Sequence, residues 1–234
     1  MEQLIKFLPS YVGSKAYWVK HLQHLRGLPF VELFCGSAVL SANLASKAYL
    51  NDIDPFIYKI LSEYQEQIVP LHFTQEDYFR VRSQPDWYKY AFCLQKMSFS
   101  GVFRYGKNGY NVPVKKNIPY INVMIDYAIS WQRYLELSPV VSCKDYKDVV
   151  IRHPEECVLI LDPPYQGAQA SYNKKFDYEA YWKFVEESKK KYKHIVLFDS
   201  ECNMPYKGYV TRKSRVNGKH KGGVEAMLEI EGDI

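Results

Sequence analysis

The sequence predicts an α/β fold whose mostly parallel sheet is interrupted by a helical segment. Short apolar runs recur along the chain between turn residues, as expected of strands that are buried on both faces. The pattern is instead helical from Pro55 to about Leu137. At 234 residues and 47% hydrophobic content, the chain can form a domain with an insertion. We therefore expect a sheet domain from residues 1–54 and 138–234, and a helical insert over residues 55–137.

The N-terminal region contains the first strand and a loop of small residues. Residues 10–15 read as a loop that carries the ring of Tyr11 and the cation of Lys15, and residues 15–25 have a helical pattern. A buried strand is expected at residues 30–34, followed by Cys-Gly-Ser-Ala and a helix to about Ala45. A strand, a small-residue loop and a helix are the start of a nucleotide-binding βαβ unit, because small residues let the backbone approach a ligand.

The second expected strand, residues 48–53, has an acidic residue, Asp52, near its end. Asp52 lies sixteen residues after Gly36. Nucleotide-binding βαβ units place the carboxylate that binds ribose hydroxyls at about this position. The alternative is structural, because Asp-x-Asp-Pro is also a common strand-end turn and helix cap. The small-residue loop before it favours the ribose role.

The helical insert contains a buried stripe and a loop of unusual composition. Helices are expected at residues 55–66, 75–82 and 87–99, and a last helix precedes residue 138. One face of that last helix has the spacing of a core-facing stripe, formed by Met124, Tyr127, Ala128, Trp131 and Leu135. The loop over residues 99–113 mixes aromatic rings, glycines, Arg104 and Lys107, and Lys115 and Lys116 follow it. Such a loop can insert a ring, read a base edge with arginine and hold phosphates with lysine. A solvated hairpin is the alternative.

The sheet resumes after the insert. Buried strands are expected at residues 140–143, 158–161 and 194–198, an amphipathic helix at 178–191, and a terminal antiparallel pair at 208–213 and 226–230. The loop that joins the terminal pair is basic. Arg215 within it could contact phosphate, although lysine-rich loops are usually only solvated.

The stretch Asp162-Pro163-Pro164-Tyr165 follows one of these strands directly. Proline cannot donate to a strand ladder, so the two prolines end the strand and leave Asp162 at its carboxyl end. That edge of an open α/β sheet is where ligands bind. A carboxylate, a rigid turn with free carbonyls and a ring form a plausible clamp for a flat ring that carries an amino group. The alternative is a plain Pro-Pro turn.

Composition restricts the environment and the partners of the chain. The net charge of +5 permits a polyanionic partner without requiring one. The five scattered cysteines form no CxxC pair, which fits reduced thiols in a cytoplasmic protein. No apolar run approaches the length of a membrane span, and the first ten residues lack a secretory signal. His21 and His24 have no thiol or carboxylate nearby in the sequence, so we expect no metal.

The motifs, taken in order, resemble those of a known family. Tyr11-Val-Gly-Ser-Lys15, Glu32-Leu-Phe-Cys-Gly36, a helical insert and Asp162-Pro-Pro-Tyr165 resemble the Dam-type (class D12, α-group) DNA adenine-N6 methyltransferases. The resemblance spans nearly the whole chain. The segments Phe99-Ser-Gly-Val-Phe-Arg-Tyr105 and Tyr110-Asn-Val-Pro113 also look like the target-recognition segment of that family.

The resemblance implies a fold, a cofactor and a set of site residues. It implies a Rossmann-like sheet that binds S-adenosylmethionine (SAM), with a small helical domain for target recognition inserted into it. The expected SAM site is lined by Tyr11, Lys15, Phe34, Gly36, Asp52, Tyr146 and Asp162. Asp162, Pro163 and Tyr165 are expected to hold a flipped adenine. The expected DNA contacts are Phe99, Ser100, Arg104, Tyr105, Asn111, Lys115, Lys116 and Arg215.

Two positions depart from the family pattern. Ala38 stands where many members have another glycine, which affects how closely the loop approaches SAM. Ser100 stands where some members have asparagine, so the recognition sequence is left open. GATC is the commonest target in the family, and Arg104 is compatible with reading a guanine in it.

The expected activity is the SAM-dependent methylation of adenine N6 at specific sites in duplex DNA, without a metal. One alternative is a methyltransferase that acts on RNA or on a protein amide, and another is a DNA-binding protein on a decayed methyltransferase scaffold. Asp162, Asp52 and Lys15 are intact, which argues against decay. A cognate restriction endonuclease is a candidate partner, and a monomer or weak dimer is the expected state. The sequence determines neither.

Overall fold

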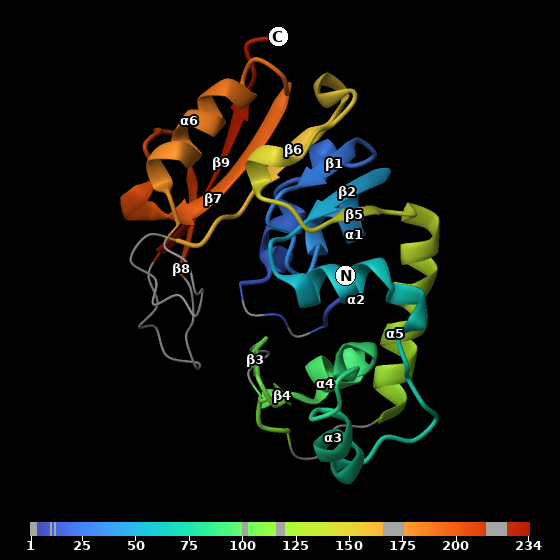
Figure 1. Cartoon of the computed structure of the whole chain (residues 1–234). Coiled ribbons are helices and arrows are strands. Elements are labelled where there is room, and N and C mark those ends of the chain that lie inside the picture. The colour runs from blue at the N-terminus through green and yellow to red at the C-terminus, as the bar shows by residue number, and fades with distance from the viewer. Residues whose placement is uncertain are drawn as a thin grey trace.

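A computed structural model describes residues 4–9, 11, 13–99, 103–115, 120–165, 176–213 and 224–234. A central sheet with helices packed on it forms one part of the molecule, and a group of short helices with a small hairpin forms the other (Figure 1). The α/β class expected from the sequence is confirmed. Within the described ranges, no helix has both the length and the apolar character needed to cross a bilayer.

The sheet has seven strands in the order β5-β2-β1-β6-β7-β9-β8. Their bounds are β1 (Pro29–Glu32), β2 (Lys47–Asn51), β5 (Val140–Ser142), β6 (Val158–Leu161), β7 (His194–Ser200), β8 (Val210–Lys213) and β9 (Val224–Glu231). The first five strands in this order are parallel, and β9 runs antiparallel to β7 and β8. The strands expected from apolar runs, including the terminal antiparallel pair, are all present.

Side chains alternate between the two faces of the sheet and form two cores. Phe30, Val158 and Val196 belong to the core on one face, and Val31, Leu159 and Leu197 belong to the core on the other. The first core includes residues of α1 (Val39–Leu44) and η1 (Lys15–Lys20), whereas the second includes residues of α6 (Tyr178–Ser188). Because both faces are covered, the central strands are mostly apolar, and β6 is apolar at every position.

The segment 15–25 is not a single helix. It forms two 3₁₀ helices, η1 and η2 (Gln23–Leu25), and the chain leaves helical geometry at Leu22. Leu22 and Leu25 are buried in the sheet core with Trp18. Burial of these side chains therefore outweighs continuation of a regular helix.

The insert contains the expected helices in shorter form. They are α2 (Pro55–Ser62), η3 (Tyr64–Glu66), α3 (Gln75–Val81), η4 (Trp87–Tyr90), α4 (Ala91–Met97) and α5 (Tyr120–Leu137). The hairpin of β3 (Tyr105–Gly106) and β4 (Gly109–Tyr110) lies between α4 and α5. Local capping sets two of the starts, because Asp54 accepts from the backbone at the start of α2 and Thr74 forms a capping box with Asp77 at α3.

The stripe expected on α5 is partly wrong. Ala128 and Leu135 are exposed, and Val123, Ser130 and Leu137 are the buried positions. Met124, Tyr127 and Trp131 are half-buried. Polar groups on the inner face explain the difference: Ser130 donates to the carbonyl of Lys6, Arg133 to that of Ala42 and Tyr134 to that of Leu61. These polar side chains donate to main-chain carbonyls, two of them on the buried Ala42 and Leu61, and apolar spacing alone cannot reveal such a face.

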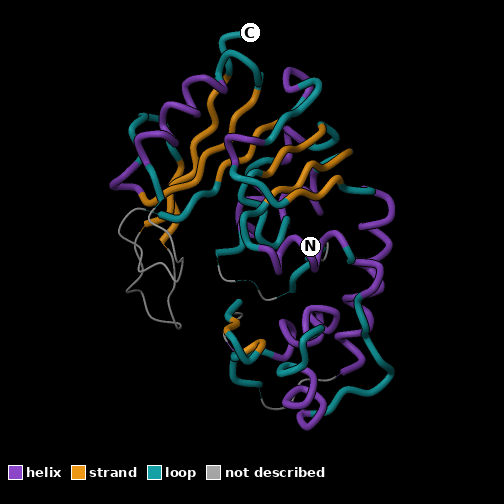
Figure 2. The backbone as a smooth tube through the Cα atoms, viewed as in Figure 1, coloured by secondary structure: helices purple, strands orange, loops and turns teal. Residues whose placement is uncertain are grey.

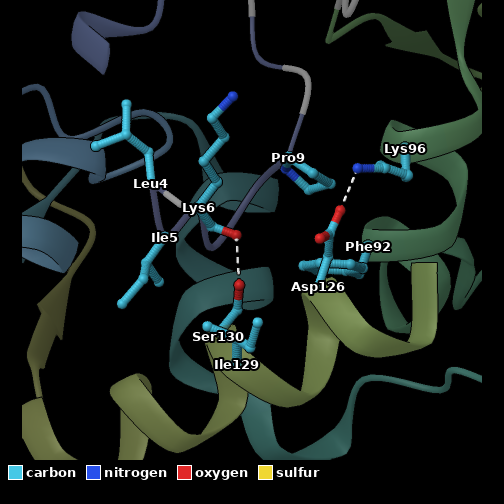
Figure 3. A pocket seen from close by; sticks show the side chains of 9 residues that line it. All are labelled: Leu4, Ile5, Lys6, Pro9, Phe92, Lys96, Asp126, Ile129 and Ser130. Atoms are coloured by element: carbon cyan, nitrogen blue, oxygen red, sulfur yellow. Dashed lines mark hydrogen bonds and ion pairs between the residues drawn. The ribbon is translucent and has the colours of Figure 1, made fainter. Parts of the chain in front are cut away.

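The insert and the sheet share one continuous core, which includes Phe30 and Leu50 of the sheet together with Tyr78 and Phe92 of the insert. Helix α5 packs against both α1 and α4 and thus joins the two parts (Figure 2). A cavity of about 300 Å³ lies at this junction, between the N-terminal segment, α4 and α5. Figure 3 shows Lys96 paired with Asp126 on its wall. The division into two domains stays a prediction.

The strand order creates a switch point at the carboxyl ends of the parallel strands. From β1 the chain proceeds outward to β2 and β5, and it then returns to β6 on the other side of β1. The loops that follow β1 and β6 therefore diverge between adjacent strands. Such a switch point, at the carboxyl ends of parallel strands, is the usual ligand site of an open α/β sheet. The small-residue loop and Asp162 lie in these two loops.

Candidate active site

Asp162 is held in place by a buried lysine. The Nζ atom of Lys15 lies 2.7 Å from Oδ2 of Asp162 and 3.2 Å from Oε1 of Glu225. Nζ also donates to the carbonyl of Gly13 at 2.7 Å. An ammonium group has three N–H donors, so these partners use all of its capacity. Lys15 was expected in the cofactor site, and the structure places it against the carboxylate of Asp162.

Glu225 completes the network around Asp162. Its Oε1 atom accepts from the hydroxyl of Tyr165 at 2.8 Å, and its Oε2 atom accepts from Nε1 of Trp18 at 2.8 Å. The side chain is 13% exposed. Tyr165 also lies under the ammonium of Lys15, 5.4 Å from its ring centroid. The structure thus brings together the predicted Asp162, Tyr165 and Lys15, and it adds Glu225, which the sequence analysis missed.

The environment shifts the pKa values of these groups in opposite directions. Burial raises the pKa of Asp162 to about 6, against the charge and hydrogen bond of Lys15, which lower it. Burial also acts to raise the pKa of Glu225, but Lys15, Trp18 and Tyr165 outweigh it and leave that pKa below the usual value. Burial would lower the pKa of Lys15, yet its two carboxylate partners raise it. At neutral pH the cluster therefore contains one cation and two carboxylates.

The loop after β1 is built for close approach. Gly36 has a φ of +46°, and a Cβ atom there would lie 2.9 Å from Cε1 of Tyr11. Its N–H donates to Oδ2 of Asp52 at 2.9 Å, while Oδ1 of Asp52 accepts from the N–H of Asp54 at 3.0 Å. Asp52 follows the last residue of β2, and its hydrogen bond to Gly36 holds the loop in place. Both roles weighed for Asp52 from the sequence are compatible with this geometry.

Ala38 ends the same loop in a left-handed conformation, with a φ of +48°, and it is fully buried. L-residues with a side chain adopt this conformation at a cost of roughly 1–2 kcal/mol, whereas glycine adopts it freely. The departure from the family pattern at this position therefore has a structural consequence, which is a strained residue directly before α1.

Aromatic rings form a wall beside this loop. The rings of Phe34 and Tyr146 lie 5.3 Å apart, and Phe176 contacts both. A nucleoside cofactor needs a flat apolar surface, a carboxylate for its ribose and a loop that its backbone can line. Phe34 and Tyr146, Asp52 and Gly36 supply these groups at one sheet edge, so the residues present fit SAM.

Two further polar residues support the strand ends. The side chain of Asn51 donates to the carbonyls of Leu33 and Lys144 and accepts from Ser142, which ties the ends of β1, β2 and β5 together. Glu32 accepts from the backbone N–H of Ser41 at 2.8 Å, and burial raises its pKa to about 7. The position of Glu32 beside the small-residue loop was the only sequence signal for these roles.

The β3–β4 hairpin presents Arg104 on a rigid base. Nε of Arg104 donates to Oδ1 of Asn111 at 2.7 Å, and Nη2 donates to the carbonyl of Asn111 at 2.9 Å. The hairpin docks on the end of α3, where the N–H of Tyr110 donates to the carbonyl of Arg82. A Cβ atom at Gly109 would lie 2.1 Å from that carbonyl oxygen, so only glycine fits this contact. The structure therefore brings Arg104 and Asn111 together and fixes the backbone beneath them.

The other residues predicted to contact DNA are placed differently. Tyr105 packs against Phe56 and donates to Oδ1 of Asp54 at 2.9 Å, which joins the hairpin to the loop after β2. Phe99 is 60% exposed, and Lys115 is half-buried. Ser100, Lys116 and Arg215 lie outside the described residues. Pro163 is buried beside Asp162.

A family model and several solved structures match the chain. The model of the D12 class N6 adenine-specific DNA methyltransferase family matches residues 11–198. No curated protein matches the chain in sequence. Among solved structures, rRNA methyltransferase aviRa from Streptomyces viridochromogenes is 12% identical, with 95% of this chain and 89% of that chain covered and a TM-score of 0.44. An rRNA methylase from Streptococcus thermophilus is 8% identical, with 92% and 93% covered and a TM-score of 0.35.

The family match includes the Tyr11 loop, the Gly36 loop, the helical insert and the Asp162 turn, and it ends within β7. These are the elements that meet at the switch point of the sheet. At such low identities the solved structures do not bear on which molecule this chain methylates. The chain belongs to the family of D12 class N6 adenine-specific DNA methyltransferases and is a SAM-dependent methyltransferase.

Proposed function

We propose that this protein methylates the exocyclic amino nitrogen of an adenine that is flipped out of duplex DNA, with GATC as the first target sequence to test. The observation that carries the proposal is the carboxylate of Asp162, held by Lys15 beside Pro163 and Tyr165 at the switch point. These groups match the chemistry that an adenine amino group requires.

The target base must leave the helix, because an adenine amino group inside a duplex cannot reach a cofactor at the sheet edge. The ring of Tyr165 replaces part of the lost stacking, which is worth about 1–3 kcal/mol per base. Lys15 occupies Oδ2 of Asp162, so we assign Oδ1 and the carbonyl of Pro163 to the two N–H groups of the adenine. These two acceptors define the position and the tilt of the base.

The two acceptors also activate the nitrogen. Its lone pair is delocalised into the ring, and hydrogen bonds to both N–H groups favour a tetrahedral nitrogen whose lone pair is available. Bound SAM supplies an electrophilic methyl group. The nitrogen would gain the methyl group as the bond between that group and the SAM sulfur breaks, which would leave S-adenosylhomocysteine. The negative charge of Asp162 would stabilise the positive nitrogen, and one of its N–H protons would then pass to solvent. No cysteine nucleophile is needed.

The cofactor half of the site rests on the loop after β1. We assign the ribose hydroxyls to Asp52 and the close backbone approach to Gly36, with Tyr11, Phe34 and Tyr146 as the surrounding rings. Asp162 borders this half as well as the adenine. The small-residue loop and the strand-end carboxylate occupy the positions that nucleotide-binding α/β folds use for the same tasks.

DNA recognition is assigned to the insert. Residues 55–137 would form the recognition domain, and residues 1–54 and 138–234 the catalytic domain. Arg104 is exposed on a docked hairpin, where its remaining N–H groups can read a guanine edge. Phe99 is an exposed ring that can fill the gap left by the flipped base. Asn111 orients Arg104. Lys115 follows the hairpin in the chain, its N–H donates to the carbonyl of Met97, and we assign its ammonium to a phosphate.

The experiment that tests the proposal follows labelled methyl groups. The protein is incubated with labelled SAM and one of four acceptors: duplex DNA with GATC, a duplex with the same bases scrambled, RNA, or a protein mixture. We expect the label as N6-methyladenine in DNA, with a preference for GATC. Label in RNA or protein would contradict the proposal that DNA is the methyl acceptor. SAM binding without methyl transfer would support a decayed enzyme.

Two variants serve as the matched pair in this assay. Asp162→Asn should lower transfer by about 10²–10³. Asp145→Asn should retain transfer, because Asp145 follows β5 but caps η6 (Tyr146–Asp148) and pairs with Lys147 instead of Lys15. Equal loss in both variants would mean that the strand-end acids act through stability rather than chemistry.

A further inference from the structure

Glu225 reaches the active site from the far end of the chain. It lies near the start of β9, paired in register with Ser200 at the end of β7 and with Arg212 on β8. Its two oxygens accept from Tyr165 and Trp18, and Lys15 lies 3.2 Å away. Arg212 lies over the ring of Tyr17. The family match ends at residue 198, so Glu225 lies beyond the matched region.

We propose that Glu225 is a positioning residue for methyl transfer. It leaves the cluster of Lys15, Asp162 and Glu225 with a net negative charge, and it holds the hydroxyl end of the Tyr165 ring in place. The inference rests on the proposed function and assigns a role to a residue outside the known motifs. Glu225 touches neither the adenine nor the cofactor. It acts through Lys15 and Tyr165.

Lys15 has two opposing effects on Asp162. A cation 2.7 Å from Asp162 holds the carboxylate in position, but it also cancels the negative charge that a positive amino nitrogen requires. Glu225 shares the same ammonium. With Lys15 positive and both acids ionised, the three groups keep a net single negative charge at the strand end. Without Glu225, Lys15 and Asp162 would form a neutral pair.

Glu225 also holds the ring of Tyr165 in place. Trp18 is fully buried and holds Oε2 of Glu225, so the position of Oε1 is fixed. That oxygen accepts from the hydroxyl of Tyr165, which holds the far end of the ring and restrains rotation about the Cα–Cβ bond. A ring that stacks on a flipped base must be held in its place before the base arrives. Glu225 therefore connects the ring to the same anchor as the cation.

The inference predicts an effect on the ionisation of Asp162. The titratable groups around this carboxyl, besides Glu225, are Lys15 on η1, Glu32 on β1, Asp52 after β2, Tyr165 after β6 and Tyr181 on α6. The negative charge of Glu225 contributes to the raised pKa of Asp162. Its removal should therefore lower that pKa, while transfer becomes slower.

The test is Glu225→Gln, with Glu229→Gln as the matched control. Glu229 is an acid on the same strand that pairs with His24 instead of Lys15. Single-turnover methylation is measured between pH 5 and pH 9, beside SAM and DNA affinities. For Glu225→Gln we expect the plateau rate to fall about 10-fold to 100-fold, less than the loss of a direct contact, with both affinities within about threefold of wild type.

The pH profile separates positioning from plain stability. Asp162 must be ionised, so the wild-type rate should fall as pH drops through about 6. In Glu225→Gln this acid limb should move to lower pH. A variant with the wild-type plateau and acid limb would overturn the inference. A slower variant whose acid limb does not move would overturn the charge argument.

A second measurement needs no substrate. The carboxyl titration of Asp162 is followed by ¹³C NMR in the free protein, and Asp162→Asn assigns the signal. We expect a lower pKa in Glu225→Gln and an unchanged one in Glu229→Gln. If Glu225→Gln does not fold, Glu225→Asp keeps the charge but shortens the reach, so the rate should fall while the pKa of Asp162 stays.

The two measurements also separate this inference from the proposed function. If the wild type methylates no adenine, the proposed function fails, and the NMR titration still decides whether Glu225 controls Asp162. If the wild type methylates adenine and Glu225→Gln does so with the same rate and profile, only the role of Glu225 fails.

Discussion

The strand-end site and the β3–β4 hairpin are built in opposite ways. At the strand end, the polar groups of Lys15, Asp162 and Glu225 are largely buried and bind one another. On the hairpin, the backbone is fixed through Gly109 and Arg82, but Arg104 is exposed. The first region is organised by contacts among its own polar groups. In the second region, a backbone in a fixed position carries a side chain that faces solvent.

The difference follows from what each region must do. A reaction needs charges at fixed positions in a low-dielectric site, where each charge acts strongly. Sequence reading needs groups that can meet a base edge, and exposed contacts can vary without disturbing the core. Substitutions at the strand end should therefore change the rate, and substitutions on the hairpin should change DNA affinity or specificity.

The largest expected effect is that of Asp162→Asn on the rate. Loss of the charge that stabilises the methylated nitrogen should lower single-turnover methylation by about 10²–10³. SAM and DNA affinities should stay near wild type, because Asp162 acts mainly as the nitrogen becomes positive. Single-turnover kinetics beside calorimetry with SAM measures both. A variant that methylates at near wild-type rate would remove the centre of the proposed site.

The same variant should be at least as stable as wild type at pH 8. The pKa of Asp162 is raised to about 6, so its charged form costs folding free energy above that pH and the cost is relieved as pH falls toward 4. Neutral asparagine removes the cost, by up to about 3 kcal/mol for a shift of this size. Lys15 loses one partner, which reduces the gain. A melt at pH 8 far below wild type would contradict the pKa argument.

Gly109→Ala should have the next largest effect, and it should fall on DNA binding. The new Cβ atom would meet the carbonyl oxygen of Arg82 at 2.1 Å, at a φ of +86°. Overpacking of this kind costs about 1–3 kcal/mol, so the hairpin should leave its docked position. Affinity for every DNA sequence should fall, while SAM affinity stays.

Gly106→Ala is the matched control for this substitution. Its Cβ atom would meet only Nδ2 of Asn111, at 3.7 Å, which is an ordinary contact. DNA titrations of the two variants should therefore differ. If both bind DNA as the wild type does, the docked hairpin is not part of the DNA interface.

Arg104→Ala should change specificity more than affinity. A bidentate arginine–guanine contact is worth about 1–3 kcal/mol of discrimination at one base pair. Lys107, exposed on the same hairpin, provides the control: Lys107→Ala should weaken binding to all sequences equally and reduce the salt dependence. Competition titrations with single-base variants of the target measure the difference. Equal loss on target and random DNA in Arg104→Ala would make Arg104 a phosphate contact.

Ala38→Gly should have the smallest effect, a gain in stability. Glycine relieves the left-handed strain at this position, roughly 1–2 kcal/mol, but it adds about 0.4–1 kcal/mol of unfolded-state entropy. The expected net gain is at most about 1.6 kcal/mol, the difference between these two effects, and it should be visible as a higher denaturant midpoint with an unchanged slope. A lower midpoint would mean that the alanine methyl group contributes more by packing than it costs by strain.

Several parts of the site were readable from local sequence patterns. The apolar runs that end in Gly36, Asp52 and Asp162 indicated which residues lie at the carboxyl ends of strands, because apolar period and proline stops are local properties. The strand order then placed these strand ends around one switch point of the sheet. Arg104 was also singled out from the composition of a single loop, and Asn111 from the resemblance of that loop to the target-recognition segment of the family.

The sequence by itself thus determined the α/β class, the strand ends, the Asp162 turn and the family. Only the tertiary structure decided that Lys15 holds Asp162, that Glu225 joins them from a strand 60 residues beyond Tyr165, and that the inner face of α5 is partly polar. The physical reason is distance along the chain. Periodicity and turn chemistry act between neighbouring residues, whereas a buried ion pair or a donor for a distant carbonyl depends on which elements the fold brings into contact.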